Sequence, residues 1–391
     1  MKSPPASGLQ AGHAGHAGHA GHAGHAGHAG HSTSDADIED TPALDASALV
    51  SNRDGIVGTF NSALAVANRV VENTANLPFW SADRRGQLLD FEVMSRIGFS
   101  QIDQTEQFML WHLSRQAVSG AAPPTVQYCP LVRLNRPPDA TYQQQTTLVA
   151  GYADLRDDRM DEILAQIDGN ETFFASILSL HPQRHRWTFE ILDLVSRTAQ
   201  FVEMRAKYAF ASRRPSEYSA QIQPMIQVPG HPSTPSGHST EAFAAAVVLI
   251  SLIPVQGVNP LYSAQSTVVQ LIRQAARIAI NRQVAGLHFP VDTATGAVLG
   301  MTLGAYLVQR MAAANTFNGW FFDGSQYPAT WDFDWSQYYD TVNLTQTKVP
   351  VIIAGTQVGT VVDQIGNASS PLGDTSDALY WLWTQAIAEW T

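Results

Sequence analysis

Apolar residues recur every three or four positions along several long stretches of the chain. Between Trp187 and Val202 this spacing places Ile191 and Leu194 on one face of a helix. The same periodicity runs through four further segments: Gln87–Arg115, Ala153–Ile167, Ser263–Ile280 and Val291–Met311. Strand and helix patterns do not alternate, and no glycine-rich dinucleotide fingerprint occurs. The pattern therefore predicts a mainly all-α fold, built as a helical bundle.

One segment, Glu241–Ile253, is apolar on nearly every side. A helix with this pattern is surrounded by other helices, so we expect it at the centre of the bundle. Gly296, Gly300 and Gly304 fall on one face of another predicted helix. Because glycine has no side chain, this face lets a neighbouring helix approach closely. We interpret the three glycines as packing residues.

Two stretches depart from the helical pattern. Residues 118–150 contain five prolines, which predicts a long irregular connection. Residues 316–391 are rich in aromatic residues, which are typical of a C-terminal segment that packs onto a core. Within this segment Val349, Val351 and Ile353 alternate with other residues, and Val358–Val362 follows after a glycine. This arrangement predicts a small β-hairpin near the C-terminus.

The first forty residues have low complexity. Ala-Gly-His repeats seven times between Ala11 and His31. Without large apolar residues the segment cannot bury enough surface to become ordered. Its composition is typical of an affinity tag or a spacer, although histidine-rich tracts also bind divalent metals loosely. We therefore expect a disordered tail over residues 1–40 and a single helical catalytic domain over residues 41–391.

Composition excludes several classes of protein. The chain of 391 residues has a formal net charge of −11, which argues against a nucleic-acid partner. Its single cysteine, Cys129, excludes an internal disulfide framework and a cysteine-rich metal site, and is expected to pack as a small apolar residue. The longest apolar run, Ala242–Ile253, has 12 residues, whereas a membrane span needs about 20. We therefore predict no membrane span.

The N-terminus has no apolar stretch of the kind found in a signal peptide. We therefore expect a soluble protein that is cytoplasmic, or secreted or periplasmic if a leader has been removed. Large helical enzymes often form homodimers or higher homo-oligomers, but no residue in the sequence indicates an interface.

Chemistry is concentrated in three short segments at the ends of predicted helices. Their polar residues are Lys207 and Arg214, then Ser236, Gly237 and His238, then Arg282, His288 and Asp292. Three cations can neutralise a compact oxyanion, and a hydroxyl and a glycine N–H at a helix start can bind its oxygens. Each residue alone is more often a solvated charge, a turn or a helix cap. Their combination in this order is better explained by an oxyanion site.

The two histidines have different expected roles within such a site. His238 stands at a helix entrance, where it can act as a general acid or base. His288 and Asp292 lie about one helical turn apart. The carboxylate can therefore hold Nδ1–H of His288 and leave Nε2 free as a nucleophile or a ligand.

These segments resemble a known superfamily. Lys-x6-Arg-Pro at Lys207, then Pro-Ser-Gly-His at Pro235, then Arg-x5-His-x3-Asp at Arg282 is similar to the signature shared by vanadium-dependent haloperoxidases and type 2 phosphatidic acid phosphatases. The motifs cover residues 207–292. The resemblance implies an α-helical fold with the site at the end of a helix bundle.

In the haloperoxidase branch, the resemblance implies that vanadate binds through His288, with His238 assisting proton transfer. Its oxygens would be held by the residues that match the family's cations and donors: Lys207, Arg214, Ser236, Gly237 and Arg282. Hydrogen peroxide and a halide are then the substrates, and the hypohalous product halogenates a small organic acceptor. His231 falls where bromoperoxidases of the family carry histidine and chloroperoxidases tend to carry an aromatic residue. It is either a halide-side residue or an ordinary polar loop residue.

In the phosphatase branch, the resemblance implies that His288 attacks phosphorus and His238 protonates the leaving group. Pro290, two residues after His288, is typical of this branch, and Met204 stands where haloperoxidases commonly carry tryptophan. The length of the chain and His231 favour the haloperoxidase branch. We therefore predict a haloperoxidase that prefers bromide or iodide to chloride, with a phosphatase as the alternative. A non-enzymatic anion-binding protein is the third interpretation, and it ranks last because every motif position is intact.

Overall fold

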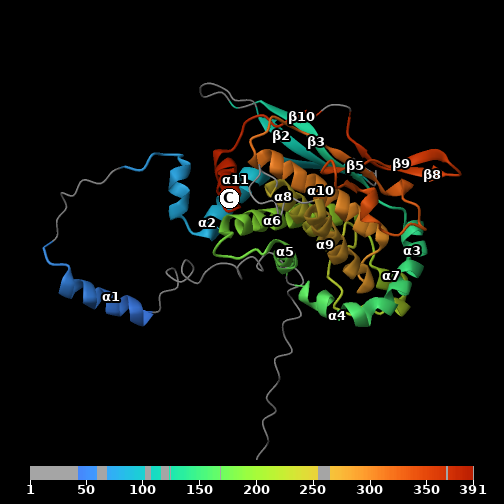
Figure 1. Ribbon diagram of the computed structural model, residues 1–391, viewed down its shortest axis with the longest axis horizontal. Coiled ribbons are helices and arrows are strands. Elements are labelled where there is room, and N and C mark those ends of the chain that lie inside the picture. The colour runs from blue at the N-terminus through green and yellow to red at the C-terminus, as the bar shows by residue number, and fades with distance from the viewer. Residues whose placement is uncertain are drawn as a thin grey trace, which may run out of the picture.

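Helices form most of the body of the protein (Figure 1). The computed structural model describes residues 43–59, 68–101, 107–115, 123, 125–167, 169–253, 265–366 and 369–390, so the prediction for residues 1–40 lies outside the described residues. The long helices are α6 (Arg186–Phe210), α8 (Gly237–Leu252), α9 (Gln265–Val284) and α10 (Pro290–Met311). The shorter helices are α1 (Ala43–Ile56), α2 (Ala82–Met94), α3 (Asp139–Gly151), α4 (Arg156–Ala165), α5 (Glu171–Leu178), α7 (Pro215–Tyr218) and α11 (Asp377–Ala388).

Helix α8 lies at the centre of the bundle, as its apolar pattern predicts. Most of its side chains are buried, and it packs against α6, α9 and α10. The predicted close approach of a neighbouring helix is also confirmed. A Cβ atom at Gly296 would overlap the backbone carbonyl of Ser236, the residue before α8. A Cβ atom at Gly304 would overlap the backbone carbonyl of Ala244 on α8. The glycines of α10 therefore bring two backbones together, and α8 and α10 hold the core.

Among the described helices, α10 alone is long and apolar enough to cross a membrane. The sequence predicts this helix but does not mark it as a candidate membrane span, because threonines and glycines interrupt its apolar residues. The rest of the protein buries 89% of its apolar stretch. This burial is typical of the core helix of a folded domain.

A six-stranded sheet accompanies the helices, so the mainly all-α prediction needs correction. Its strand order is β1-β2-β3-β5-β9-β8, with β3 and β5 parallel and the other neighbours antiparallel. The strands of this sheet are β1 (Ile97–Gln101), β2 (Gln107–Arg115), β3 (Val126–Asn135), β5 (Trp320–Asp323), β8 (Val349–Ile353) and β9 (Thr356–Gln364). The short strands β4 (Thr316–Phe317) and β10 (Ser370–Pro371) form one pair, and β6 (Tyr339–Asp340) and β7 (Thr345–Gln346) form another.

The sheet corrects two sequence predictions and confirms a third. The segment Gln87–Arg115 is helical only in α2, because its second half forms β1 and β2. Strand β2 buries three consecutive residues, Phe108–Leu110, so its apolar residues do not alternate strictly and resemble a helical pattern. The connection over residues 118–150 is not irregular throughout, because it contains β3 and α3. Pro130 is tolerated within β3 because it lies opposite Trp111 beside a β-bulge. The predicted C-terminal hairpin is confirmed as β8–β9.

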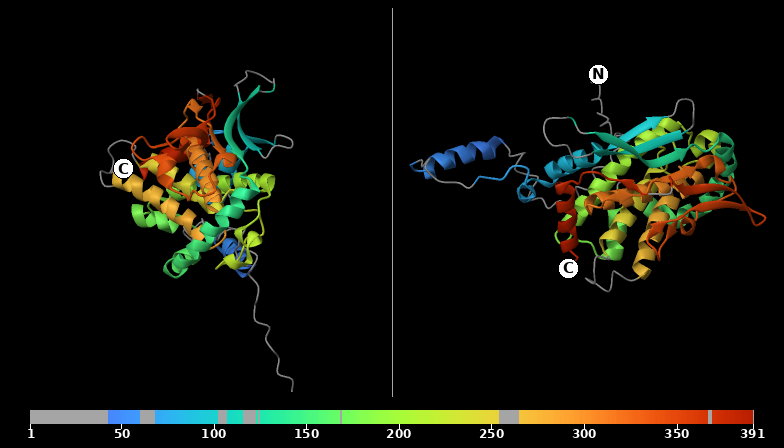
Figure 2. Two further views of the ribbon diagram at one scale, coloured as in Figure 1. Left: turned by 90° about the vertical axis from the view of Figure 1, so that its right-hand side faces the viewer. Right: turned by 90° about the horizontal axis from the view of Figure 1, so that it is seen from above.

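The sheet lies along one side of the helix bundle (Figure 2). Strands β3, β4 and β5 contact α10, and β2 contacts α6. Cys129 is buried in β3, as expected. At one end of the bundle, α6 and α9 finish where α8 and α10 begin, and the loops between them carry the three motif segments.

Candidate active site

The residues of the three motif segments come together at this end of the bundle. Lys207 is in the last turn of α6, and Arg214 directly precedes α7. Ser236, Gly237 and His238 form the start of α8, Arg282 is in the last turn of α9, and His288 and Asp292 flank the start of α10. The three cations are almost fully buried. Because burying a cation without a partner is unfavourable, their grouping indicates a binding site for an anion.

The hydrogen bonds of His288 define its tautomer. Its Nε2 atom lies 2.9 Å from Nη1 of Arg214, and a guanidinium can only donate hydrogen bonds. Nε2 must therefore be the unprotonated nitrogen. Nδ1 carries the proton and lies 3.3 Å from Oδ2 of Asp292. Burial lowers the pKa of His288 well below its usual value, and the charges of Arg214 and Lys207 lower it further. His288 is therefore neutral with a nitrogen lone pair directed at a cation.

Asp292 is fixed by several donors besides His288. The backbone N–H of Phe289 donates to Oδ2 over 2.9 Å, and the hydroxyls of Ser233 and Thr234 donate to the two carboxylate oxygens. Burial raises the pKa of Asp292 above its usual value, whereas these hydrogen bonds act in the opposite direction. The carboxylate therefore has a single orientation, in which it holds the Nδ1 proton of His288.

Lys207 and Asp292 also shape the loop before α8. Nζ of Lys207 donates to the carbonyls of Ser233 and Pro235. The N–H of Ser236 donates to the backbone carbonyl of Asp292 over 3.0 Å, which ties the start of α8 to α10. Burial lowers the pKa of Lys207, and Arg214 adds to this effect. An anion nearby would oppose this shift and favour the charged ammonium.

His238 and Arg282 share a contact that the sequence did not indicate. The backbone carbonyl of Gln166 lies 2.7 Å from Nε2 of His238, so this nitrogen carries the proton. The side-chain oxygen of Gln166 accepts a hydrogen bond from Nη2 of Arg282 over 3.0 Å. Burial and then the charge of Arg282 lower the pKa of His238 to about 3. His238 is therefore neutral in the protein alone, with its lone pair on Nδ1.

Several buried polar atoms at this site have no hydrogen-bond partner within the described part of the chain, and three of them belong to residues of the motif helices. These three are Oγ of Ser236, Nε of Arg282 and Oε2 of Glu203. An unpaired buried donor is unfavourable by about 1–3 kcal/mol, so the first two atoms indicate that an acceptor belongs there. Oxygens of a tetrahedral oxyanion would satisfy both donors. The residues present therefore fit vanadate or phosphate.

His231 is also brought into the site. Nη2 of Arg214 lies 3.1 Å from Nδ1 of His231, and Nε of Arg214 donates to its backbone carbonyl. Arg214 therefore bridges the two histidines His231 and His288. Burial, together with the charges of Lys207 and Arg214, lowers the pKa of His231 to about 4. His231, His238 and Gly237 are partly exposed, so this side of the pocket faces solvent.

Sequence reasoning missed Glu203 and Gln166. Glu203 lies one helical turn before Lys207, and a Cβ atom at Gly237 would overlap its carboxylate. Gly237 is therefore required by its contact with Glu203, as well as by any approach of an anion. The four-residue spacing of Glu203 and Lys207 was a usable signal. Gln166 gave none, because its contacts to α8 and α9 are long-range.

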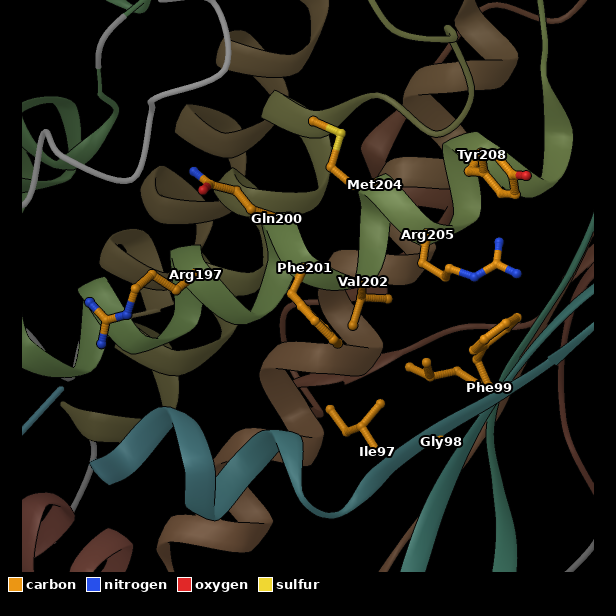
Figure 3. A pocket seen from close by; sticks show the side chains of 11 residues that line it. Ile97, Gly98, Phe99, Arg197, Gln200, Phe201, Val202, Met204, Arg205 and Tyr208 are labelled. Carbon is orange, nitrogen blue, oxygen red and sulfur yellow. The ribbon is translucent and has the colours of Figure 1, made fainter. Parts of the chain in front are cut away.

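An apolar groove lies outside this site. It has a volume of about 760 Å³ and lies between β1 and α6 (Figure 3). Met204, Arg205 and Tyr208 line it from α6, and Phe99 lines it from β1. It contains none of the motif residues. Met204, at the position where haloperoxidases commonly have tryptophan, thus contributes to this outer groove.

Comparison with known protein families supports the resemblance of the motif region to the PAP2 superfamily. A model of the PAP2 superfamily matches residues 192–316, and this region contains all three motif segments. No curated protein matches the chain. The predicted residues therefore lie together within the region that matches the PAP2 superfamily model, while their individual roles stay predictions.

Two solved structures are similar over part of the chain. One is a bacterial vanadium-dependent iodoperoxidase, 23% identical with a TM-score of 0.28, and the match covers 35% of each chain. The other is a transmembrane PAP2-type phosphatidylglycerolphosphate phosphatase from Bacillus subtilis, 19% identical with a TM-score of 0.29, covering 44% of this chain and 83% of that one. This chain therefore spans about a third of the iodoperoxidase.

Proposed function

We propose that the protein is a vanadate-dependent haloperoxidase that oxidises bromide or iodide with hydrogen peroxide. One observation carries the proposal: the Nε2 lone pair of His288 lies in a pocket of three buried cations, with its Nδ1 proton held by Asp292. This tautomer is the one that can bind a metal oxyanion through nitrogen. The PAP2-superfamily match supports an enzyme built on this pocket.

Each residue of the pocket has a role in holding the oxyanion. His288 would supply the nitrogen ligand, and the hydroxyl of Ser236 and the N–H of Gly237 would donate to oxygens. Lys207, Arg214 and Arg282 would neutralise its charge. When bound, vanadate supplies a Lewis acid that activates hydrogen peroxide toward a halide. The protein provides the orientation and the charge, and needs no redox-active side chain.

His238 is the proton-transferring residue of this proposal. Its Nε2 proton is held by the carbonyl of Gln166, so Nδ1 is the atom that gains and loses a proton. In the protein alone its pKa is lowered to about 3. Negative charge beside the ring favours the imidazolium, so binding of an oxyanion raises this pKa toward the working range. His238 thus becomes an acid only when the site is filled.

His231 is the candidate halide-side residue. It is neutral, partly exposed and hydrogen-bonded to Arg214, which itself contacts His288. A halide approaching from solvent would therefore meet His231 beside the cation that flanks the reactive centre. We propose that bromide or iodide is preferred to chloride here, because these anions are more weakly hydrated and lose less hydration on entering the partly buried pocket.

A phosphatase is the second candidate, because the same geometry suits nucleophilic attack. A neutral His288 with Nδ1–H held by Asp292 can attack a phosphate monoester through Nε2 and form a phosphohistidine. Pro290 at the first position of α10 is the feature of this segment that resembles the phosphatase branch.

Two assays on one purified preparation separate the candidates. The first follows bromination of a dye by hydrogen peroxide and bromide, with and without orthovanadate. The second follows hydrolysis of a phosphate monoester by vanadate-free protein. We expect vanadate-dependent bromination. Hydrolysis without bromination, inhibited by vanadate, would instead assign the site to a phosphatase.

A further inference from the structure

A carboxyl group that this function does not use lies beneath the anion pocket. Glu203 is on α6, one turn before Lys207, and its side chain is only 3% exposed. One carboxylate oxygen packs against Gly237. The other, Oε2, has no hydrogen-bond partner in the described part of the chain. A buried acid therefore lies between the two helices that supply the cation and the glycine N–H of the pocket.

A polar strip continues from Glu203 along the interface of α6 and α8. Glu241 lies one turn after Gly237 on α8, and its Oε2 accepts a hydrogen bond from Ser196 over 3.0 Å. Gln200 donates to the same serine hydroxyl. Ser196, Gln200 and Glu203 are spaced by four and three residues, so they share one face of α6. The strip crosses an otherwise apolar helix contact.

The strip ends at a small cavity beside α5. The cavity has a volume of about 20 Å³, and its polar lining comes from Asn170, Glu171, Ser196 and Glu241. This volume is sufficient for about one water molecule. Oδ1 of Asn170 is a buried acceptor without a partner among the described residues. Such a polar cavity is suited to an ordered water, and we name it the α5 cavity.

Both carboxyl groups of the strip favour a bound proton. Burial raises the pKa of Glu203, although Lys207 and Arg214 partly oppose this shift. Burial also raises the pKa of Glu241, and the charge of Glu203 raises it further. Two nearby buried carboxylates are unfavourable when both are ionised. The charged groups that act on this pair are Lys207 on α6, Arg214 before α7 and Glu171 on α5.

We propose that Glu203 and Glu241 hold a proton for the anion pocket: Glu203 binds one proton when an oxyanion occupies the site beside Gly237, and Glu241 exchanges that proton with water in the α5 cavity. One O–H bond forms at the Glu203 carboxylate, and the proton comes from solvent and returns there when the anion leaves. The inference rests on the oxyanion site of the proposed function. Oxidation of a halide by hydrogen peroxide to hypohalous acid consumes one proton per turnover. A proton held on Glu203 beside the site would be available for this reaction.

Proton uptake on binding of inorganic phosphate tests this inference without turnover. Calorimetric titration of the full chain in two buffers of different ionisation enthalpy gives the number of protons taken up per phosphate. Comparison with Glu203→Gln at the same pH removes the contribution of phosphate itself. Near neutral pH the wild type is expected to take up on the order of one proton more than the variant. Its infrared spectrum should gain a protonated carboxyl band on binding, and E203Q should not.

Glu389→Gln is the matched control. Glu389 is another half-buried carboxyl with a raised pKa, but it binds the backbone N–H groups of Trp187 and Thr188 at the opposite end of α6. Its loss should leave proton uptake unchanged. Glu241→Gln serves as a second variant that keeps Glu203 in place, so it should leave the equilibrium uptake unchanged and slow the exchange of the proton with solvent.

The outcomes separate this inference from the proposed function. Phosphate binding with equal proton uptake in wild type and E203Q would overturn the inference and leave the oxyanion site intact. A wild-type protein that binds neither phosphate nor vanadate would overturn the proposed function, and the inference with it.

Discussion

Arg214 and His288 are joined by a contact of 2.9 Å between Nη1 and Nε2. Since the guanidinium is only a donor, this contact fixes the histidine tautomer from one side, while Asp292 fixes it from the other. The arrangement also places a fixed positive charge next to the atom that is proposed to bind the oxyanion. Under the proposed function, Arg214 therefore orients His288 and would neutralise the anion.

Replacing Arg214 by lysine keeps the charge but removes the fork that bridges His231 and His288. We expect Arg214→Lys to weaken vanadate binding by about 10- to 100-fold, which corresponds to the loss of one or two hydrogen bonds to a charged group. Equilibrium dialysis measures this change. The adjacent Arg213 is exposed and provides the control, because Arg213→Lys should bind vanadate like the wild type. Equal weakening by both variants would refute the role of Arg214.

Because Gly237 contacts Glu203, we expect the effect of Gly237→Ala on stability to depend on the residue at position 203. A methyl group at position 237 would overlap the Glu203 carboxylate, so Gly237→Ala should destabilise the protein by about 1–3 kcal/mol. In a Glu203→Ala background the overlap is absent, and the same change should be nearly neutral. Thermal or denaturant unfolding of the four proteins gives the interaction free energy. An equal loss of stability in both backgrounds would show that Glu203 is not the obstacle.

The buried Glu241 predicts how stability changes with pH. Burial, followed by the charge of Glu203, raises the pKa of Glu241 to about 8, above its usual value near 4.5. The folded state therefore binds this proton more tightly than the unfolded state does. Its contribution to stability is present below the usual carboxyl pKa and is lost as the pH rises through about 8. Glu241→Gln, which cannot ionise, should lose less stability than the wild type between about pH 5 and about pH 9.

Unfolding midpoints at the two pH values measure this difference. Parallel losses of stability in wild type and E241Q would mean that Glu241 titrates normally. The Glu389→Gln variant is again useful, because it removes a distant carboxyl with a raised pKa.

Replacing His231 is expected to change the halide preference. Phenylalanine at this position cannot accept the hydrogen bond from Arg214 at Nδ1. We expect His231→Phe to shift the ratio of bromide to chloride turnover toward chloride by about fivefold, the equivalent of one hydrogen bond of about 1 kcal/mol. Turnover with the two halides at matched concentration measures the ratio. An unchanged ratio would remove His231 from the halide pocket.

The candidate site was more predictable from the sequence than the fold was. The residues of the pocket occupy short motifs in which chemistry and spacing occur together, so Lys207, Ser236 and His288 could be grouped before their distances were known. Glu203 and Gln166 were missed because their importance depends on contacts with helices that are distant in sequence. The four-residue spacing of Glu203 from Lys207 was a local signal of its place beside the site, whereas a single glutamine such as Gln166 carries no such signal.

The sheet was missed for a different physical reason. Strand β2 is buried on both faces around Phe108–Leu110, so strict alternation is lost. Strand β3 contains Pro130, which the irregularity in its pairing with β2 accommodates. By contrast, β8–β9 at the C-terminus was predictable, because its valines alternate and a glycine follows the first strand. Local patterns thus identified the hairpin but not the non-local strand pairs.

The central claim is that Nε2 of His288 anchors an oxyanion in the pocket. Equilibrium dialysis of orthovanadate with the wild type and with His288→Ala tests it most directly, and His181→Ala on the exposed surface serves as the control. We predict that the wild type and H181A bind vanadate alike, and that H288A binds it weaker by about two orders of magnitude. Vanadate binding by H288A as tight as that of the wild type would contradict the account.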